Sequence, residues 1–134
     1  MITIVQPVLD DIQAHAGAET PRECCGILVG TGDRIVSHVR ATNLEGGTTR
    51  FLLDPQDHIR ALREARARGL DVVGFYHSHP RTRAYPSATD VAECGYAGVL
   101  HLIVGTDEQG APEARLFTID GQTIAEVPYV VVNG

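Results

Sequence analysis

Two histidines one residue apart, followed by a serine and an aspartate, are the residues of this sequence best placed to do chemistry. They lie in GFYHSHPRTRAYPSATD (74–90) as His77, His79, Ser87 and Asp90. In an extended strand, alternate side chains point to the same face, so His77 and His79 project together with Cα atoms roughly 6.5–7 Å apart. Two imidazoles at that separation can converge on one ion, and a carboxylate from the next helix can join them. Three protein ligands with one position left for water are typical of a catalytic zinc site.

The serine and the aspartate also fit a structural role that needs no metal. Ser87-x-x-Asp90 has the spacing of a capping box. In a capping box, a serine side chain caps the start of a helix, and an acidic side chain three positions later bonds back to the backbone N–H of that serine. Taken alone, the histidines likewise fit ordinary structural residues of a strand. Capping does not require histidines upstream, however, so the combination favours the metal site.

The combination also resembles the signature of a known family. His77-x-His79, seven residues, Ser87, two residues and Asp90 match the HxH-x7-S-x2-D motif of the JAMM (MPN+, Mov34/JAB-type) zinc metalloproteases without a departure. The family's upstream glutamate corresponds to Glu23 in PRECCGILVG. The resemblance covers essentially the whole chain. The short chain is similar to the compact bacterial branch that processes sulfur-carrier proteins, including carrier–cysteine adducts.

The resemblance implies a fold, a reaction and a role for each residue. The fold would be a JAB/MPN domain of cytidine-deaminase-like architecture. His77, His79 and Asp90 would hold one Zn2+ per chain. Glu23 would be the general base, and Ser87 would donate a hydrogen bond to the oxyanion. The reaction would be peptidase or isopeptidase hydrolysis of the bond after the Gly-Gly tail of a ubiquitin-like sulfur-carrier protein.

Other polar residues are weaker candidates. Glu93, on the helix that follows the motif, is an alternative base. Arg81 and Arg83 lie in the loop over the expected site and are either solvated or a clamp for a substrate carboxylate. Cys24 and Cys25 are expected to be small buried residues of an apolar strand. The remaining histidines have no partners at ligand spacing and are expected to be structural or exposed: His15, His38, His58 and His101.

The alternation of strand and helix patterns predicts an α/β fold with a mixed β-sheet flanked by three helices. Strands are expected at 2–5, 23–30, 34–42, 71–80 and 99–105, and in ARLFTI and QTIAEV around the Asp120-Gly121 turn. Helices are expected at 7–18, at 54–70 after a capping Asp54, and from 87 onward. The polar segment 43–50 is expected to be a loop.

The composition predicts a single domain over residues 1–134, in a reduced cytoplasmic setting. Hydrophobic residues make up 43% and charged residues 21%, as in ordinary globular proteins. The net charge of −6 disfavours nucleic acid and anionic membranes as partners. No apolar run approaches the roughly 20 residues that span a bilayer, and the N-terminus has no signal-peptide pattern. Three cysteines do not make a disulfide framework. All 11 basic residues are arginine, and neither the cause of the absent lysine nor the oligomeric state follows from the sequence.

Three classes of function compete. The zinc peptidase leads, with another peptide such as a cell-wall fragment as its alternative substrate. A zinc nucleobase deaminase needs H-x-E with P-C-x-x-C, which this sequence lacks. A non-catalytic MPN-type interaction module would show lost ligands, and none is lost.

For the peptidase, an extended substrate is expected in a cleft bounded by strand 71–79 and loops 43–50 and 81–86, paired with an exposed strand edge.

Overall fold

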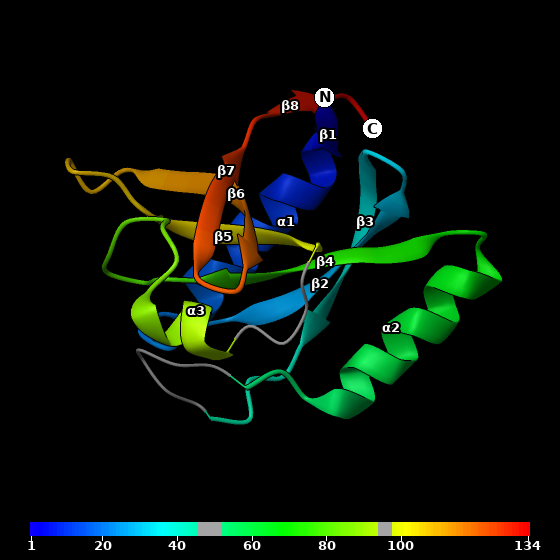
Figure 1. Ribbon diagram of the computed structural model, residues 1–134, viewed down its shortest axis with the longest axis horizontal. Helices are drawn as coiled ribbons and strands as arrows, with labels where there is room; N and C mark the ends of the chain where they lie inside the picture. Colours follow the sequence, from blue (N-terminus) through cyan, green and yellow to red (C-terminus); the bar gives the residue numbers. More distant parts are fainter. Residues whose placement is uncertain (46–51, 94–97) are drawn as a thin grey trace.

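The computed structural model describes residues 1–45, 52–93 and 98–134. Within these residues, eight strands form one sheet accompanied by three helices (Figure 1). The strands are β1 (Ile2–Val5), β2 (Cys25–Thr31), β3 (Arg34–Ala41), β4 (Asp71–Ser78), β5 (Leu100–Thr106), β6 (Pro112–Asp120), β7 (Thr123–Val127) and β8 (Tyr129–Val132). The helices are α1 (Gln6–Glu19), α2 (Pro55–Ala67) and α3 (Ala88–Glu93). The predicted α/β class is confirmed.

The sheet is mixed, and the histidine-bearing strand β4 lies inside it. The strand order is β7-β6-β5-β4-β2-β3-β1-β8. The pairs β4–β5, β1–β3 and β1–β8 are parallel, and the other neighbours are antiparallel. In register, His77 lies opposite Cys25 of β2 and Ile103 of β5. Because β4 is hydrogen-bonded on both sides, its backbone is held firmly where it enters the site.

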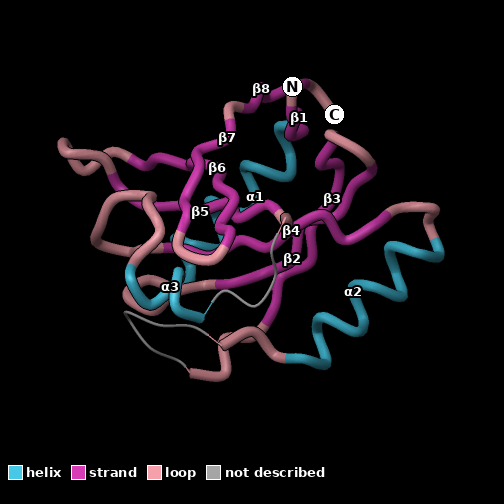
Figure 2. Tube along the Cα trace, in the orientation of Figure 1, coloured by secondary structure: helices cyan, strands magenta, loops and turns pink. Residues whose placement is uncertain are grey.

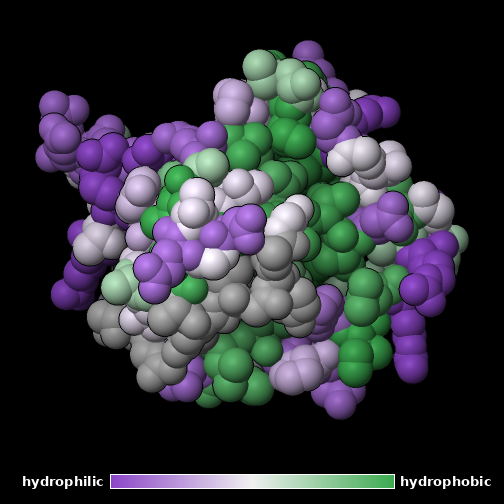
Figure 3. Space-filling view, viewed as in Figure 1, coloured by the Kyte–Doolittle hydropathy of each residue, from purple (hydrophilic) through white to green (hydrophobic). Residues whose placement is uncertain are grey.

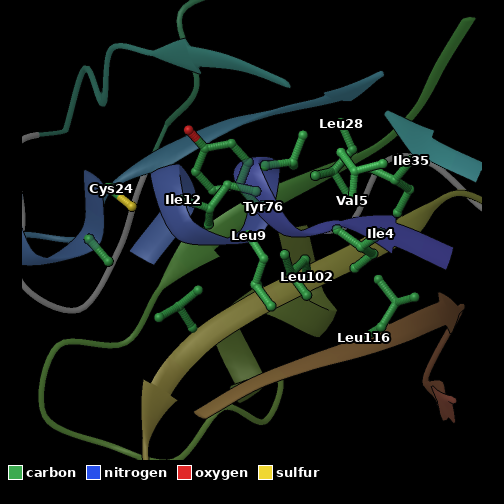
Figure 4. Close-up of a cluster of buried hydrophobic side chains, with 13 residues drawn as sticks. Ile4, Val5, Leu9, Ile12, Cys24, Leu28, Ile35, Tyr76, Leu102 and Leu116 are labelled. Carbon is green, nitrogen blue, oxygen red and sulfur yellow. The ribbon is translucent and has the colours of Figure 1, made fainter. Parts of the chain in front are cut away.

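The helices α1 and α2 cover opposite faces of the sheet, as the alternation of side chains along the strands requires. Tyr76 and Leu28 point toward α1, where they join Ile12 in the main hydrophobic cluster (Figure 4). Ile27 and Phe75 point the other way, into a second cluster with Ala61 and Ala65 of α2. Figure 2 shows the strands in the middle of the molecule, with α2 running along the outside. His77 follows Phe75 by two residues and therefore points to the α2 side.

Local sequence signals explain where α2 and the last hairpin begin and end. The Asp54 carboxylate accepts a hydrogen bond from the backbone N–H of Gln56 at 2.9 Å, and Pro55 occupies the first helical position. Gly121 has a φ of 61°, a left-handed conformation that suits the tight turn between β6 and β7. Both predictions are confirmed.

The structure differs from the sequence prediction in three places. Strand β8 was not predicted, and it pairs in parallel with β1, so both ends of the chain lie at one edge of the sheet (Figure 1). The strand predicted over 71–80 ends at Ser78, two residues before Pro80. Glu23 precedes β2 rather than lying within it. Residues 46–50 of the predicted loop, residue 51 and residues 94–97 of the predicted helix lie outside the described residues.

The outer surface is polar at the turn that joins β5 to β6. Figure 3 shows hydrophilic side chains over this turn, at the left of the view. Glu108 in the turn has a side chain that is 82% exposed. Among the helices in the described ranges, none is long and apolar enough to cross a membrane.

Candidate active site

The two histidines of the motif lie together on the α2 side of the sheet. His79 follows the last residue of β4, but its backbone N–H donates to the Val104 carbonyl at 2.7 Å and so extends the pairing with β5. The side chains of both histidines are buried, with the Nε2 atoms of His77 and His79 3.2 Å apart. The expectation that they converge is therefore met by the geometry.

Asp90, in the first turn of α3, brings a carboxylate oxygen to the same point. Its Oδ2 lies 3.1 Å from Nε2 of His77 and 3.1 Å from Nε2 of His79. Ligands about 2.0–2.1 Å from a tetrahedral zinc ion are separated by about 3.3 Å, so this triangle has the size that one ion requires. The set of two imidazole nitrogens and one carboxylate oxygen is also one that zinc binds in catalytic sites.

Burial and hydrogen bonding favour the ligand forms of two of these groups. Burial lowers the pKa of His77, which keeps its imidazole neutral and able to offer a lone pair. Burial disfavours a charge on Asp90, but the hydrogen bonds from His77 and His79 outweigh that effect and hold the pKa of Asp90 below its usual range. A neutral imidazole and an ionised carboxylate are the forms that bind a metal.

The tautomer of His79 is fixed by a backbone contact. Its Nδ1 lies 3.0 Å from the Arg83 carbonyl oxygen. A carbonyl can only accept a hydrogen bond, so Nδ1 carries a hydrogen, and in the neutral imidazole, the form that binds a metal, Nε2 has the lone pair. The loop 81–86 therefore aims His79 at the ligand triangle.

Glu23 places a second carboxylate beside the histidines. It lies two residues before Cys25, where the β2–β4 register continues toward His79. Its side chain is only 4% exposed, and within the described part of the chain its Oε1 has no hydrogen-bond partner. Burial raises the pKa of Glu23 to about 7. One ligand atom from each of Glu23, His77 and His79 lies within 4.8 Å of the others. A buried carboxylate with an unused oxygen fits either a proton acceptor or a further metal ligand.

The capping box and the triangle share one carboxylate. The Ser87 hydroxyl oxygen accepts from the backbone N–H of Asp90 at 3.0 Å, and the N–H of Ser87 donates to Oδ2 of Asp90 at 2.9 Å. This Oδ2 is also the atom that faces the two histidines. The structural alternative and the ligand arrangement therefore coexist, and the capping box orients Asp90. The Ser87 hydroxyl accepts in this contact, so its hydrogen is left to donate elsewhere.

A hollow of about 590 Å³ opens beside Ser87. Its described lining comes from the start of α3 and the turn between β6 and β7: Pro86, Ser87, Ala88, Val91, Gly121, Gln122 and Ile124. Because Ser87 belongs both to this hollow and to the capping box, a molecule held there would lie next to the ligand triangle.

The structure separates the weaker candidates. Arg83 is already paired with Glu113, through Nε at 2.7 Å and Nη2 at 3.2 Å, so its guanidinium is engaged within the protein. Cys24 and Cys25 are buried, and burial raises their pKa values to about 11 and about 12, so both thiols stay protonated. The side chain of Glu93 lies outside what the structure describes.

The four histidines outside the motif have partners away from the triangle. The Nδ1 of His15 lies 2.8 Å from the Tyr76 hydroxyl oxygen. His38 contacts Asp11, and the rings of His58 and His101 pack near Phe75. None of the four contributes to the metal-ligand cluster found among the described residues.

Two residues that support the site were missed in the sequence. The Asn43 side-chain amide donates to the backbone carbonyl of Glu23 at 2.9 Å and so fixes the chain just before β2. Glu113 binds the loop that carries Arg83. Neither residue belongs to a local motif, because each reaches the site only through the pairing of distant segments.

The fold and this cluster together define a JAB/MPN domain. Residues 5–120 match the family described as prokaryotic homologs of the JAB domain. The chain belongs to this family, so the resemblance seen in the sequence is confirmed. The structure is similar to a JAB1/MPN domain protein, AF2198, from Archaeoglobus fulgidus, with a TM-score of 0.63 at 24% identity over 99% of this chain and 98% of that one. It is also similar to the protein DSY2949 from Desulfitobacterium hafniense, with a TM-score of 0.89 at 29% identity over 100% and 94%.

Two similar relatives are named as a peptidase and a desampylase. The CysO-cysteine peptidase of Mycobacterium tuberculosis is 31% identical over 135 residues, which cover 99% of this chain and 92% of the relative. The desampylase of Haloferax volcanii is 33% identical over 113 residues, which cover 79% and 81%. The chain is accordingly an enzyme of this peptidase family.

Proposed function

We propose that this chain is a zinc-dependent peptidase that hydrolyses the bond after the Gly-Gly tail of a ubiquitin-like or sulfur-carrier protein. The observation that carries the proposal is the ligand triangle of His77, His79 and Asp90, beside which lies Oε1 of Glu23, an atom with no hydrogen-bond partner among the residues that the structure describes. The names of the relatives support the substrate class, since one is a CysO-cysteine peptidase and another a desampylase. The single-domain organisation and the cytoplasmic location stay predictions.

In this proposal, His77, His79 and Asp90 hold the zinc ion. When bound, zinc would lower the pKa of a coordinated water from about 15.7 to about 7. Glu23 takes the proton from the attacking water and later delivers it to the leaving amine. Its raised pKa suits a group that must both accept and release a proton near neutral pH.

Ser87 stabilises the charge that develops on the scissile carbonyl. Its oxygen is occupied as an acceptor from the N–H of Asp90, which orients the hydroxyl and leaves its hydrogen for the oxyanion. A single oxyanion donor contributes about 2.7–4 kcal/mol to the transition state. The capping contact therefore prepares Ser87 for this role.

A glycine tail suits the surroundings of these residues. Glycine has no Cβ, so its backbone can approach a buried centre closely. The end of β4 that carries His77 offers no free edge for the substrate, because there it pairs with β2 on one side and with β5 on the other. An extended tail would instead align with the segment around Asn43 and Leu53, which form an isolated bridge. The hollow beside Ser87 would receive the group that follows the scissile bond.

Mass spectrometry of a carrier before and after incubation tests the proposal. The substrate is a ubiquitin-like carrier that ends in Gly-Gly followed by one further residue, incubated with zinc-loaded protein. We expect loss of the residue after Gly-Gly and an unchanged carrier body. A matched carrier with valine at the second glycine should stay intact. Equal cleavage of both tails would contradict the proposed specificity, and cleavage of neither at high enzyme concentration would contradict the proposed substrate.

A further inference from the structure

Glu113 of β6 is connected to His79 through a single peptide group. Its Oε2 accepts the backbone N–H of Ala84 at 2.8 Å. The carbonyl of that same peptide group belongs to Arg83, and it accepts the Nδ1 hydrogen of His79 at 3.0 Å. In a trans peptide the N–H and the C=O point in opposite directions. The carboxylate, the peptide and the imidazole therefore form one continuous series of hydrogen bonds.

The carboxylate is held firmly at its end of the series. Arg83 donates to it from Nε at 2.7 Å and from Nη2 at 3.2 Å, a bidentate geometry that fixes the plane of the carboxylate. The side chain of Glu113 is 16% exposed, and Ala84 is fully buried. The hydrogen bond from the peptide N–H to the carboxylate is thus shielded from water, where its electrostatic effect is larger than at the surface.

A glycine in β5 allows the Arg83–Ala84 peptide group to approach Glu113. Gly105 of β5 lies opposite Glu113 in the β5–β6 register. A Cβ at Gly105 would lie 2.5 Å from the Thr82 carbonyl oxygen and 2.6 Å from the nitrogen of Ala84. The neighbouring N–H of Thr106 donates to that Thr82 carbonyl at 2.8 Å. The missing side chain lets the loop lie directly on β5, within reach of Glu113.

We propose that Glu113 is a positioning residue of the metal centre, acting on His79 through the Arg83–Ala84 peptide group. An anion that accepts the peptide N–H polarises the peptide and makes its carbonyl a stronger acceptor. A stronger acceptor at Nδ1 orients the ring and raises the basicity of Nε2. In many metal sites a carboxylate performs this task by direct contact with the histidine. Here a peptide group is interposed. The inference rests on the proposed zinc site.

The test compares zinc affinity among variants by competition with a chromophoric chelator. Glu113→Gln keeps an oxygen that can accept the Ala84 N–H but removes the charge, and Glu113→Ala removes both. Glu126→Gln is the matched control, because Glu126 pairs with Arg115 in the same bidentate way, at 3.0 and 2.6 Å, and within the described part of the chain it makes no hydrogen bond to the loop 81–86. His77→Ala serves as the reference for the site itself.

We expect zinc affinity to fall about 10–100-fold in Glu113→Ala and by a smaller factor, still above threefold, in Glu113→Gln, the range typical of residues behind a metal ligand. The absorption spectrum of the cobalt-substituted protein should shift in both, and neither property should change in Glu126→Gln. Melting of the metal-free proteins shows which variants fold, and Glu113→Gln keeps the test valid if Glu113→Ala does not.

Wild-type affinity and spectrum in folded Glu113→Gln would overturn the inference, whatever the alanine variant shows. The reference variant separates this failure from a failure of the proposed function. If His77→Ala binds zinc as well as the wild type, the proposed metal site itself is wrong. If His77→Ala loses zinc while both Glu113 variants keep it, only the role of Glu113 is wrong.

Discussion

Replacing Glu23 with glutamine should stabilise the metal-free protein, by an amount that grows with pH. Glu23 is only 4% exposed, and its Oε1 has no hydrogen-bond partner among the described residues. Burial raises its pKa from 4.5 to about 7, so the folded state holds a proton that the unfolded chain has already released. The wild type therefore loses stability as the pH rises from 4.5 through 7. Glutamine has nearly the same shape but no proton to lose, so its stability should lack this decline.

The size of the effect follows from the same pKa. Each tenfold change in proton affinity corresponds to about 1.36 kcal/mol, so the rise of the Glu23 pKa to about 7 corresponds to about 3 kcal/mol. Relative to its value at pH 4.5, the gain in unfolding free energy of Glu23→Gln should therefore approach about 3 kcal/mol at pH 8.

Urea denaturation of both proteins between pH 4.5 and 8, with zinc removed by a chelator, measures this difference. Glu64→Gln is a suitable control for the chemical change itself, because Glu64 is an exposed residue of α2. A Glu23→Gln difference that stays constant with pH would refute the reasoning, since the buried carboxylate would then have no unfavourable charged form.

Three further outcomes are expected. Ser87→Asp should keep the helix cap, with a change in unfolding free energy below about 1 kcal/mol. It should nevertheless lower kcat at least about 10²-fold, because it places a negative charge beside the oxyanion. A stable and fully active variant would contradict the oxyanion role. Gly26→Ala should lower the free energy of unfolding, measured in urea, by about 1–3 kcal/mol. The new Cβ would lie 2.1 Å from the ring of Tyr76, and the hydroxyl of that ring is hydrogen-bonded to His15. Unchanged stability would show that the ring can move. Removal of metal by a chelator should abolish hydrolysis and added zinc should restore it; activity that persists in demonstrably metal-free protein would contradict the zinc mechanism.

The candidate site was predictable from the sequence where it depends on short-range spacing. His77 and His79 share a face because one strand carries both, and Asp90 follows Ser87 within the first turn of α3. Glu23 came only from the family resemblance, because its approach to His79 depends on the antiparallel register of β2 and β4. A local pattern gives the identity of a strand, whereas the register between two strands is set by the whole sheet.

The parts that were missed depend on contacts between distant segments. The tail that forms β8 is rich in valine, a residue that favours strands, but its partner β1 lies at the other end of the chain. Glu113 supports the loop 81–86 only because it faces Gly105 across the β5–β6 pair. Nothing within either segment alone indicates these contacts.

Zinc content measured together with turnover, in Glu23→Gln and Asp90→Asn, tests the central claim most directly. Both carboxylates lie beside the histidines, so the two variants decide which one binds the metal and which one moves the proton. We expect Glu23→Gln to retain one zinc per chain and to lose at least about 10² in rate, and Asp90→Asn to lose most of its zinc. Loss of zinc from Glu23→Gln, with full zinc content and turnover in Asp90→Asn, would contradict the assignment of these two residues.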